Sequence, residues 1–152
     1  MEGSLSEKAE KIAIWERSRR EDLHFLQGAL GAEELDLDQD PLSFLAILDH
    51  FVAVQDYDTL DEDGWFWLHA ALAAYIAQVI LVLYQADWDL ITDDRGLNYV
   101  LVVKGLDGND HLVSPMDVVH DDFSRSRPPE VARMLGSAEV TAGVALGSWN
   151  RA

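Results

Sequence analysis

The chain has 152 residues, of which 28 are Asp or Glu and 11 are Lys or Arg, so its formal net charge at pH 7 is −17; hydrophobic residues make up 49%. This composition is typical of a globular protein, and the acidity argues against direct nucleic-acid binding, because duplex affinity comes largely from Lys and Arg contacts with phosphates. The absence of cysteine excludes disulfides and cysteine nucleophiles and fits a reducing compartment, so we expect a cytoplasmic protein.

Residues 1–30 predict a basic amphipathic helix. Apolar residues recur at helical spacing, as at Ile12 and Trp15, and five of the eleven basic residues of the chain lie in this segment. The stretch 16–22 has no apolar side. We expect that stretch to lie in solvent or against an acidic surface of the protein itself.

Residues 31–63 predict an acidic helix between two acidic loops. The helix should begin at Asp40 and Pro41, with the aspartate as N-cap and the proline in the first helical position. Eleven acidic residues lie between Glu33 and Asp63. The two loops should emerge at opposite ends of the helix, roughly 20 Å apart at 1.5 Å per residue.

A central apolar helix is predicted over residues 64–86. From Gly64 to Ala86 there is no Asp, Glu, Lys or Arg, and a run of that length can cross a bilayer core. His69 and Gln78 within the run, and acidic flanks on both sides, argue against a membrane span, which usually has Lys or Arg near its ends. We therefore expect a buried core helix and no membrane association.

After the central helix the apolar pattern changes from helical to alternating. Short alternating runs separated by the turns DDRG and GLDGND predict a three-stranded antiparallel β-meander over residues 87–114. Residues 115–135 predict short helices, and residues 136–152, rich in Gly, Ala, Ser and Val, predict a loosely held tail. The sequence thus predicts a single α+β domain over residues 1–135, in which N-terminal helices pack on the meander and short C-terminal helices follow.

The segment 68–123 combines an alanine-rich helix, a β-hairpin, a third strand and a proline-led helix. The residues that carry this pattern are Leu72, Ala73, Tyr75, Val79, Trp88, Val102, Val103, Pro115, Asp117 and Val118. The pattern resembles small bacterial α+β domains of unknown function, some of whose relatives are thought to be immunity or interaction proteins. The resemblance implies an immunity-like or interaction role and supplies no catalytic residues.

The distribution of charge is the main functional signal in the sequence. From Glu21 to Asp94 the chain has 17 acidic residues and no Lys or Arg. This distribution is explained either by solubility, with carboxylates at helix N-termini, or by an electrostatic docking face for a basic protein partner. The docking hypothesis predicts a non-enzymatic protein-binding module of the immunity or inhibitor kind. The carboxylates expected to form its face are Asp36, Asp38, Asp40, Asp56, Asp58, Asp61 and Asp63.

Three consecutive aromatic residues, Trp65, Phe66 and Trp67, open the central helix beside these carboxylates. Adjacent helical residues point about 100° apart, so the three cannot share one buried face and one should be exposed. An exposed tryptophan beside acidic residues is suited to anchoring a protein partner. We therefore expect Trp65 or Trp67 to be the anchor.

Two other classes of function stay open on the sequence alone. A DNA-mimic inhibitor would need carboxylates spaced like phosphates, and a small hydrolase would need Asp and His residues that converge in one pocket. The pattern Asp36-x-Asp38-x-Asp40 resembles the start of an EF-hand loop, but Pro41 stands where that loop requires glycine. The five scattered histidines lack zinc-site spacing. We predict no metal, no cofactor and no catalytic residue. The sequence does not indicate the oligomeric state.

Overall fold

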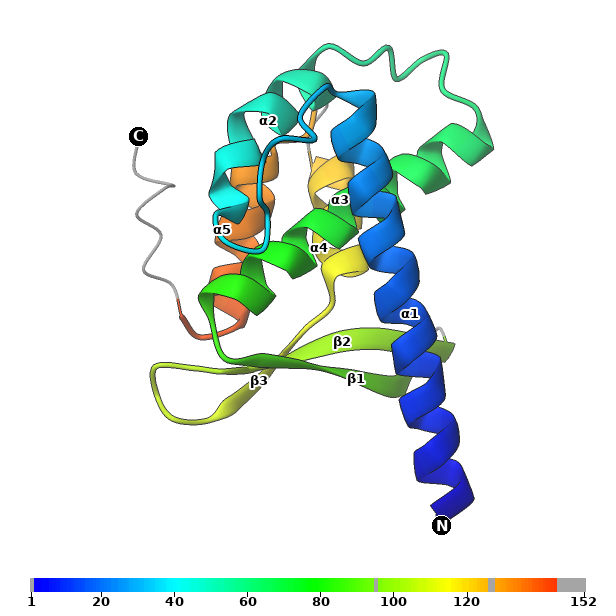
Figure 1. Ribbon diagram of the computed structural model, residues 1–152, viewed down its shortest axis with the longest axis vertical. Coiled ribbons are helices and arrows are strands. Elements are labelled where there is room, and N and C mark those ends of the chain that lie inside the picture. Colours follow the sequence, from blue (N-terminus) through cyan, green and yellow to red (C-terminus); the bar gives the residue numbers. More distant parts are fainter. Residues whose placement is uncertain (1, 95, 126–127, 145–152) are drawn as a thin grey trace.

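The computed structural model describes residues 2–94, 96–125 and 128–144, with side-chain surroundings from Glu7 onward. It confirms the α+β class, with helices followed by a three-stranded antiparallel meander and then by further helices (Figure 1). The elements in chain order are α1 (Glu2–Ala29), the 3-10 helix η1 (Pro41–Phe44), α2 (Leu45–Ala53), α3 (Glu62–Leu83), β1 (Ala86–Asp93), β2 (Gly96–Lys104), β3 (Asp110–Val113), α4 (Pro115–Arg125) and α5 (Val131–Thr141).

The sheet has the strand order β1-β2-β3, and both strand pairs are antiparallel. Ala86 faces Val103 at one end of the first pair, and Asp93 faces Gly96 at the turn. Gly96 has a φ of 108°, a conformation that side-chain-bearing residues rarely adopt, so this glycine permits the tight connection. The helices lie over one face of the sheet (Figure 1). The meander therefore forms one layer of the fold, and the helices form a second layer on one of its faces.

Helix α3 forms the centre of the core because it is apolar all round. Every residue from Ala71 to Ile80 is buried, and the helix begins where Asp61 accepts a hydrogen bond from the Gly64 amide at 2.7 Å. It is long and apolar enough to cross a membrane by length and composition, and 61% of its most apolar window is buried inside the fold. Its surroundings are α1, α4, α5, η1 and β1.

Helix α1 folds back onto the body of the protein. Trp15 stacks on Tyr99 of β2 with ring centroids 4.3 Å apart and meets Trp88 of β1 edge to face. In the polar stretch 16–22, Arg19 is buried with 3% exposure and points its guanidinium at α3, whereas its neighbour Arg20 is exposed. The stretch therefore lies partly in solvent and partly against the protein itself.

The second helix begins differently from the prediction. Residues 41–44 form the 3-10 helix η1, and the Asp40 side chain makes no capping hydrogen bond, although Pro41 does occupy the first helical position. Instead, the Asp40 carbonyl accepts from the Ser43 hydroxyl at 2.7 Å. A 3-10 turn is frequent at the start of an α-helix, and here it brings Pro41 and Phe44 into the core.

The prediction that a tail begins at residue 136 is wrong, because α5 continues to Thr141 and the backbone is described as far as Val144. Its Gly and Ala residues are small enough to pack closely: Gly136 and Ala138 are buried. Carboxylates from other helices bind the start of α5, since Asp49 accepts from the Val131 amide at 2.6 Å and Asp122 accepts from the Glu130 amide at 2.9 Å. Residues 145–152 of the predicted tail lie outside the described residues.

Candidate functional site

Ten acidic residues with exposed side chains lie in two clusters along the chain. The backbone segments that carry them come before and after the η1–α2 segment (Figure 1). The acidic loop, residues 33–40, contributes Glu33, Glu34, Asp36, Asp38 and Asp40; the second acidic cluster, residues 56–63, contributes Asp56, Asp58, Asp61, Glu62 and Asp63. Among the described residues, only one of the ten forms an ion pair, namely Asp38 with Arg20 at 3.4 Å. The structure therefore does not unite the predicted carboxylates into one patch, but leaves both clusters largely without cations.

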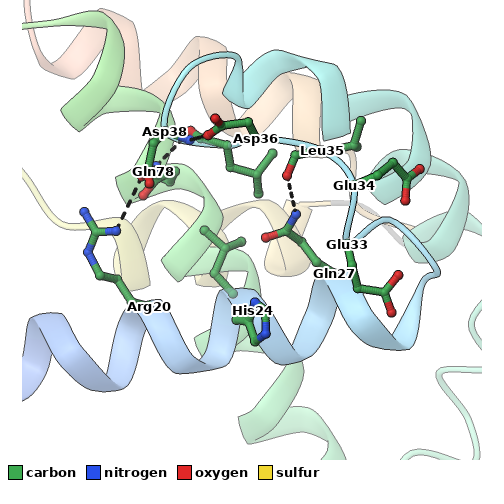
Figure 2. Close-up of a pocket in the computed structure, with 11 residues that line it drawn as sticks. Arg20, His24, Gln27, Glu33, Glu34, Leu35, Asp36, Asp38 and Gln78 are labelled. Atoms are coloured by element: carbon green, nitrogen blue, oxygen red, sulfur yellow. Dashed lines mark hydrogen bonds and ion pairs between the residues drawn. The ribbon is translucent and has the colours of Figure 1, made fainter.

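The backbone of the acidic loop is held by two buried glutamines from two different helices (Figure 2). Gln27 of α1 donates its side-chain amide to the carbonyls of Ala32 at 3.1 Å and Leu35 at 3.0 Å. Gln78 of α3 donates to the Leu37 carbonyl at 2.8 Å and to the Asp38 carboxylate at 3.0 Å. Buried amides that find such partners fix the loop, while its carboxylates remain in water.

Gln78 is itself oriented by Arg19, whose guanidinium donates to the Gln78 side-chain oxygen at 2.9 Å and to the Ala74 carbonyl at 3.3 Å. Arg19 also binds Glu16, which in addition accepts a hydrogen bond from the Trp88 indole of β1. Burial raises the pKa of Glu16, but the hydrogen bonds and charge of Arg19, the Trp88 hydrogen bond and the charge of Arg20 together outweigh it and hold that pKa below its ordinary value. A continuous polar network thus connects the sheet, α1, α3 and the acidic loop.

A cavity of about 370 Å³ lies between α1 and the acidic loop. Figure 2 shows Asp36 and Asp38 at the end of this cavity near Gln78, with Arg20 and His24 on the α1 side. Within the loop, Asp36 accepts from the Asp38 amide at 3.1 Å. The two carboxylates therefore also shape the loop that presents them.

Within the described part of the chain, the second acidic cluster is organised by local hydrogen bonds. Asp56 accepts from the Asp58 amide at 3.2 Å, and Asp61 caps α3. Glu62 and Asp63 occupy the first turn of α3, where the macrodipole favours negative charge. Helix capping explains three of these carboxylates without any partner, so this cluster is weaker support for docking than the acidic loop.

The exposed aromatic residue at the start of α3 is Phe66, with 71% exposure, and not a tryptophan. Trp65 packs edge to face on Phe123 at 5.2 Å, and Trp67 meets Phe25 edge to face at 6.0 Å, so both are partly buried. The prediction of one exposed residue among the three is correct, but the expectation of an exposed tryptophan is wrong. Phe66 takes the place expected for the anchor.

Two histidines and an aspartate line one hollow of about 360 Å³ between α3 and α4, namely His69, His120 and Asp117. The His69 Nδ1 atom lies 2.8 Å from the Trp65 carbonyl and must donate to it, because a carbonyl only accepts. The same ring stacks on Phe123 at 4.4 Å. The hydrogen bond to Trp65 places the ring proton on Nδ1 and leaves Nε2 as the acceptor nitrogen of His69.

Among the described residues there is no group of three or more His, Asp or Glu side chains that could hold a metal ion.

We expect His69 to make folding sensitive to mild acid. Burial lowers the pKa of His69, the hydrogen bond to Trp65 opposes this shift, and the neighbouring His120 lowers the pKa further. As the pH falls below about 6.5, the unfolded chain takes up a proton that the folded protein resists, so the free energy of unfolding should decrease. Urea titrations at about pH 7.5 and about pH 5.5 measure this change.

The variant His69→Asn is the matched control for this prediction, because asparagine retains a donor near the position of Nδ1 but does not titrate. It should lose less stability than the unmodified protein over the same pH interval. An equal loss in both proteins would assign the acid sensitivity to other groups.

Sequence reasoning missed Arg19, Gln27 and Gln78, the residues that position the acidic loop. The sequence shows Gln78 only as a polar residue within an apolar helix. Its place in the uncharged run from Gly64 to Ala86 is the available signal, since a buried amide requires partners. The identity of those partners depends on a contact between positions 37 and 78, which no local pattern reports.

Comparisons with known proteins leave the structure as the basis for functional inference. No protein-family model matches the chain, and neither the curated proteins nor the solved structures compared with it gave a match.

Proposed function

We propose that this chain is a non-enzymatic protein-binding module that docks a basic protein through the acidic loop. The observation that carries the proposal is the combination of a backbone held by buried side chains with exposed, largely unpaired carboxylates. Residues 68–123 resemble small bacterial domains of unknown function, some of whose relatives are thought to be immunity proteins, and this is consistent with a cytoplasmic immunity or inhibitor protein.

The hydrogen bonds that fix the backbone of the acidic loop favour a docking role for its carboxylates over a role in solubility alone. Carboxylates that serve only solubility need no fixed positions, whereas a docking surface gains affinity when its groups are ordered before the partner arrives. Here Gln27 and Gln78 fix two carbonyls of the loop and that of Ala32, which precedes it, and Arg19 orients Gln78. The entropic cost of ordering the loop is therefore met during folding and not during association.

The charge of the loop accounts for the class of partner. Arg20 offsets one carboxylate, and no ion pair offsets Glu33, Glu34, Asp36 or Asp40 in the described part of the chain. A patch of one sign accelerates encounter with a partner of the opposite sign and repels other acidic proteins. The second acidic cluster adds to the same long-range field without needing direct contact.

Reversing the charge of Glu33, Glu34 and Asp40 to lysine tests this proposal. The carboxylates of these three residues make no hydrogen bond within the described structure, unlike those of Asp36 and Asp38, so the loop should keep its shape. We expect association with the basic partner captured from cell lysate to slow by about tenfold or more at low salt, and by much less at high salt. Stopped-flow or surface-based kinetics measure this rate.

A second triple variant, with lysine at Asp87, Asp110 and Asp121, is the matched control. These side chains are exposed, lie outside the acidic loop, and change the net charge by the same amount. An equal slowing by both variants would show that only total charge matters. An unchanged rate in the loop variant would refute docking through this loop.

A further inference from the structure

A groove runs along α3 and α4 and is distinct from the acidic loop. Its first hollow, about 400 Å³, is lined by Trp15, Leu97, Tyr99, Phe66 and Met116. Phe66 and Met116 also line the neighbouring hollow that contains His69 and His120, and those two histidines continue into a third hollow of about 200 Å³. The shared residues join the three hollows end to end, an elongated form that suits a peptide segment more than a compact ligand.

The apolar lining of the groove is exposed to an unusual degree. Phe66 is 71% exposed and Leu97 is 61% exposed, although they belong to different elements, α3 and β2. Single exposed apolar residues are ordinary, whereas a concave surface with two such residues at its first hollow marks an interaction site.

Negative charge surrounds the exposed ring of Phe66. Glu62 and Asp63 precede it by four and three positions on α3 and therefore share its helix face. Glu62 and Asp63 are exposed and form no ion pair within the described part of the chain, so the charge beside Phe66 is complementary to a cationic segment.

We propose that this groove binds an amphipathic segment of the basic partner, with an aliphatic or aromatic side chain seated against Phe66 and Met116 and flanking Lys or Arg residues beside the carboxylates. The positive charge of that segment rests on the proposed function; the apolar contact is new. The partner is then held at two places, by a charged contact at the acidic loop and by an apolar contact at the groove. The apolar contact persists at salt concentrations that weaken the charged one.

Two synthetic probes distinguish these contacts on the full chain. One is an amphipathic peptide built only of lysine and leucine, and the other is an oligolysine with the same number of charges. In NMR titrations we expect the amphipathic peptide to shift the Met116 methyl and the Trp15 indole signals. Oligolysine should shift amides of the acidic loop, such as that of Asp36, and leave the Met116 methyl and Trp15 indole signals unchanged.

The variant Phe66→Ser should weaken binding of the amphipathic peptide by roughly tenfold or more, the effect of a buried aromatic anchor, and leave oligolysine binding unchanged. Phe25→Ser is the matched control, because Phe25 is similarly exposed, at 64%, but lies outside the groove. This control should not alter the affinity for either peptide.

Three outcomes would overturn the proposal. If both peptides shift only acidic-loop signals, the groove is not a docking site and the proposed function stands. If neither peptide shifts any signal, both the groove and the proposed function fail. If the Met116 and Trp15 signals change on dilution of the protein alone, a second copy of this chain covers the groove.

Discussion

Replacing Arg19 with methionine is expected to lower the free energy of unfolding by about 3 kcal/mol, measured by urea denaturation. The Arg19 side chain is 2% exposed and binds Glu16, Gln78 and the Ala74 carbonyl. Methionine fills much of the same volume but leaves these acceptors without their donor, and a buried charge that loses its partner is costly. The expected value is at the low end for a buried pair, because Glu16 is 27% exposed to water.

The variant Arg20→Met is the control for the loss of a positive charge. Arg20 is 57% exposed and makes only surface pairs with Glu16 and Asp38, which contribute about 0.5 kcal/mol or less. Similar destabilisation by the two variants would mean that burial of Arg19 does not determine its contribution. In Arg19→Met we also expect increased hydrogen exchange in the acidic loop, because Gln78 loses the group that orients it.

Replacing Phe44 with alanine is expected to cost about 3–5 kcal/mol, the usual range for deleting a fully buried aromatic ring. Phe44 has no exposed surface and meets Tyr75 edge to face, with ring centroids 6.0 Å apart. The Tyr75 hydroxyl donates to the Pro41 carbonyl at 2.7 Å, so both rings hold η1 against α3. A cavity here removes packing that the rigid centre of the core cannot restore.

Phe25→Ala is the comparison for this prediction. Phe25 is 64% exposed, so its removal should change stability by less than about 1 kcal/mol. Equilibrium urea titrations of both variants measure the difference. A loss below about 1 kcal/mol in Phe44→Ala would mean that η1 does not pack as the structure shows.

The parts of the fold that followed from sequence are those governed by local patterns. The uncharged run of α3, the change to alternating apolar residues after Ala86, and the turn at Gly96 each report their structure within a few neighbouring positions. The C-terminal half of α5 was different, because the sequence predicts helix only as far as residue 135, whereas α5 ends at Thr141 with Gly136 and Ala138 buried. That burial depends on the tertiary structure, and local composition does not report it.

In the candidate site, too, some features follow from neighbouring residues in the sequence, whereas others depend on tertiary contacts. The exposure of the acidic side chains followed from their charge, whereas the role of Gln78 in holding residue 37 did not. The choice of Phe66 over its tryptophan neighbours as the exposed ring depends on where α4 lies, because Phe123 covers Trp65. Helical periodicity predicted that one ring is exposed but not which one.

The residues that fix the backbone of the acidic loop differ from the residues that carry most of its exposed charge. Gln27 and Gln78 bind mainly backbone carbonyls, so the side chains at positions 33, 34 and 40 contribute nothing to fixing the loop. Substitutions there should change stability by no more than about 0.5 kcal/mol. If the acidic loop docks a partner as we propose, substitutions at those positions would change the choice of partner while the two glutamines keep the loop in place.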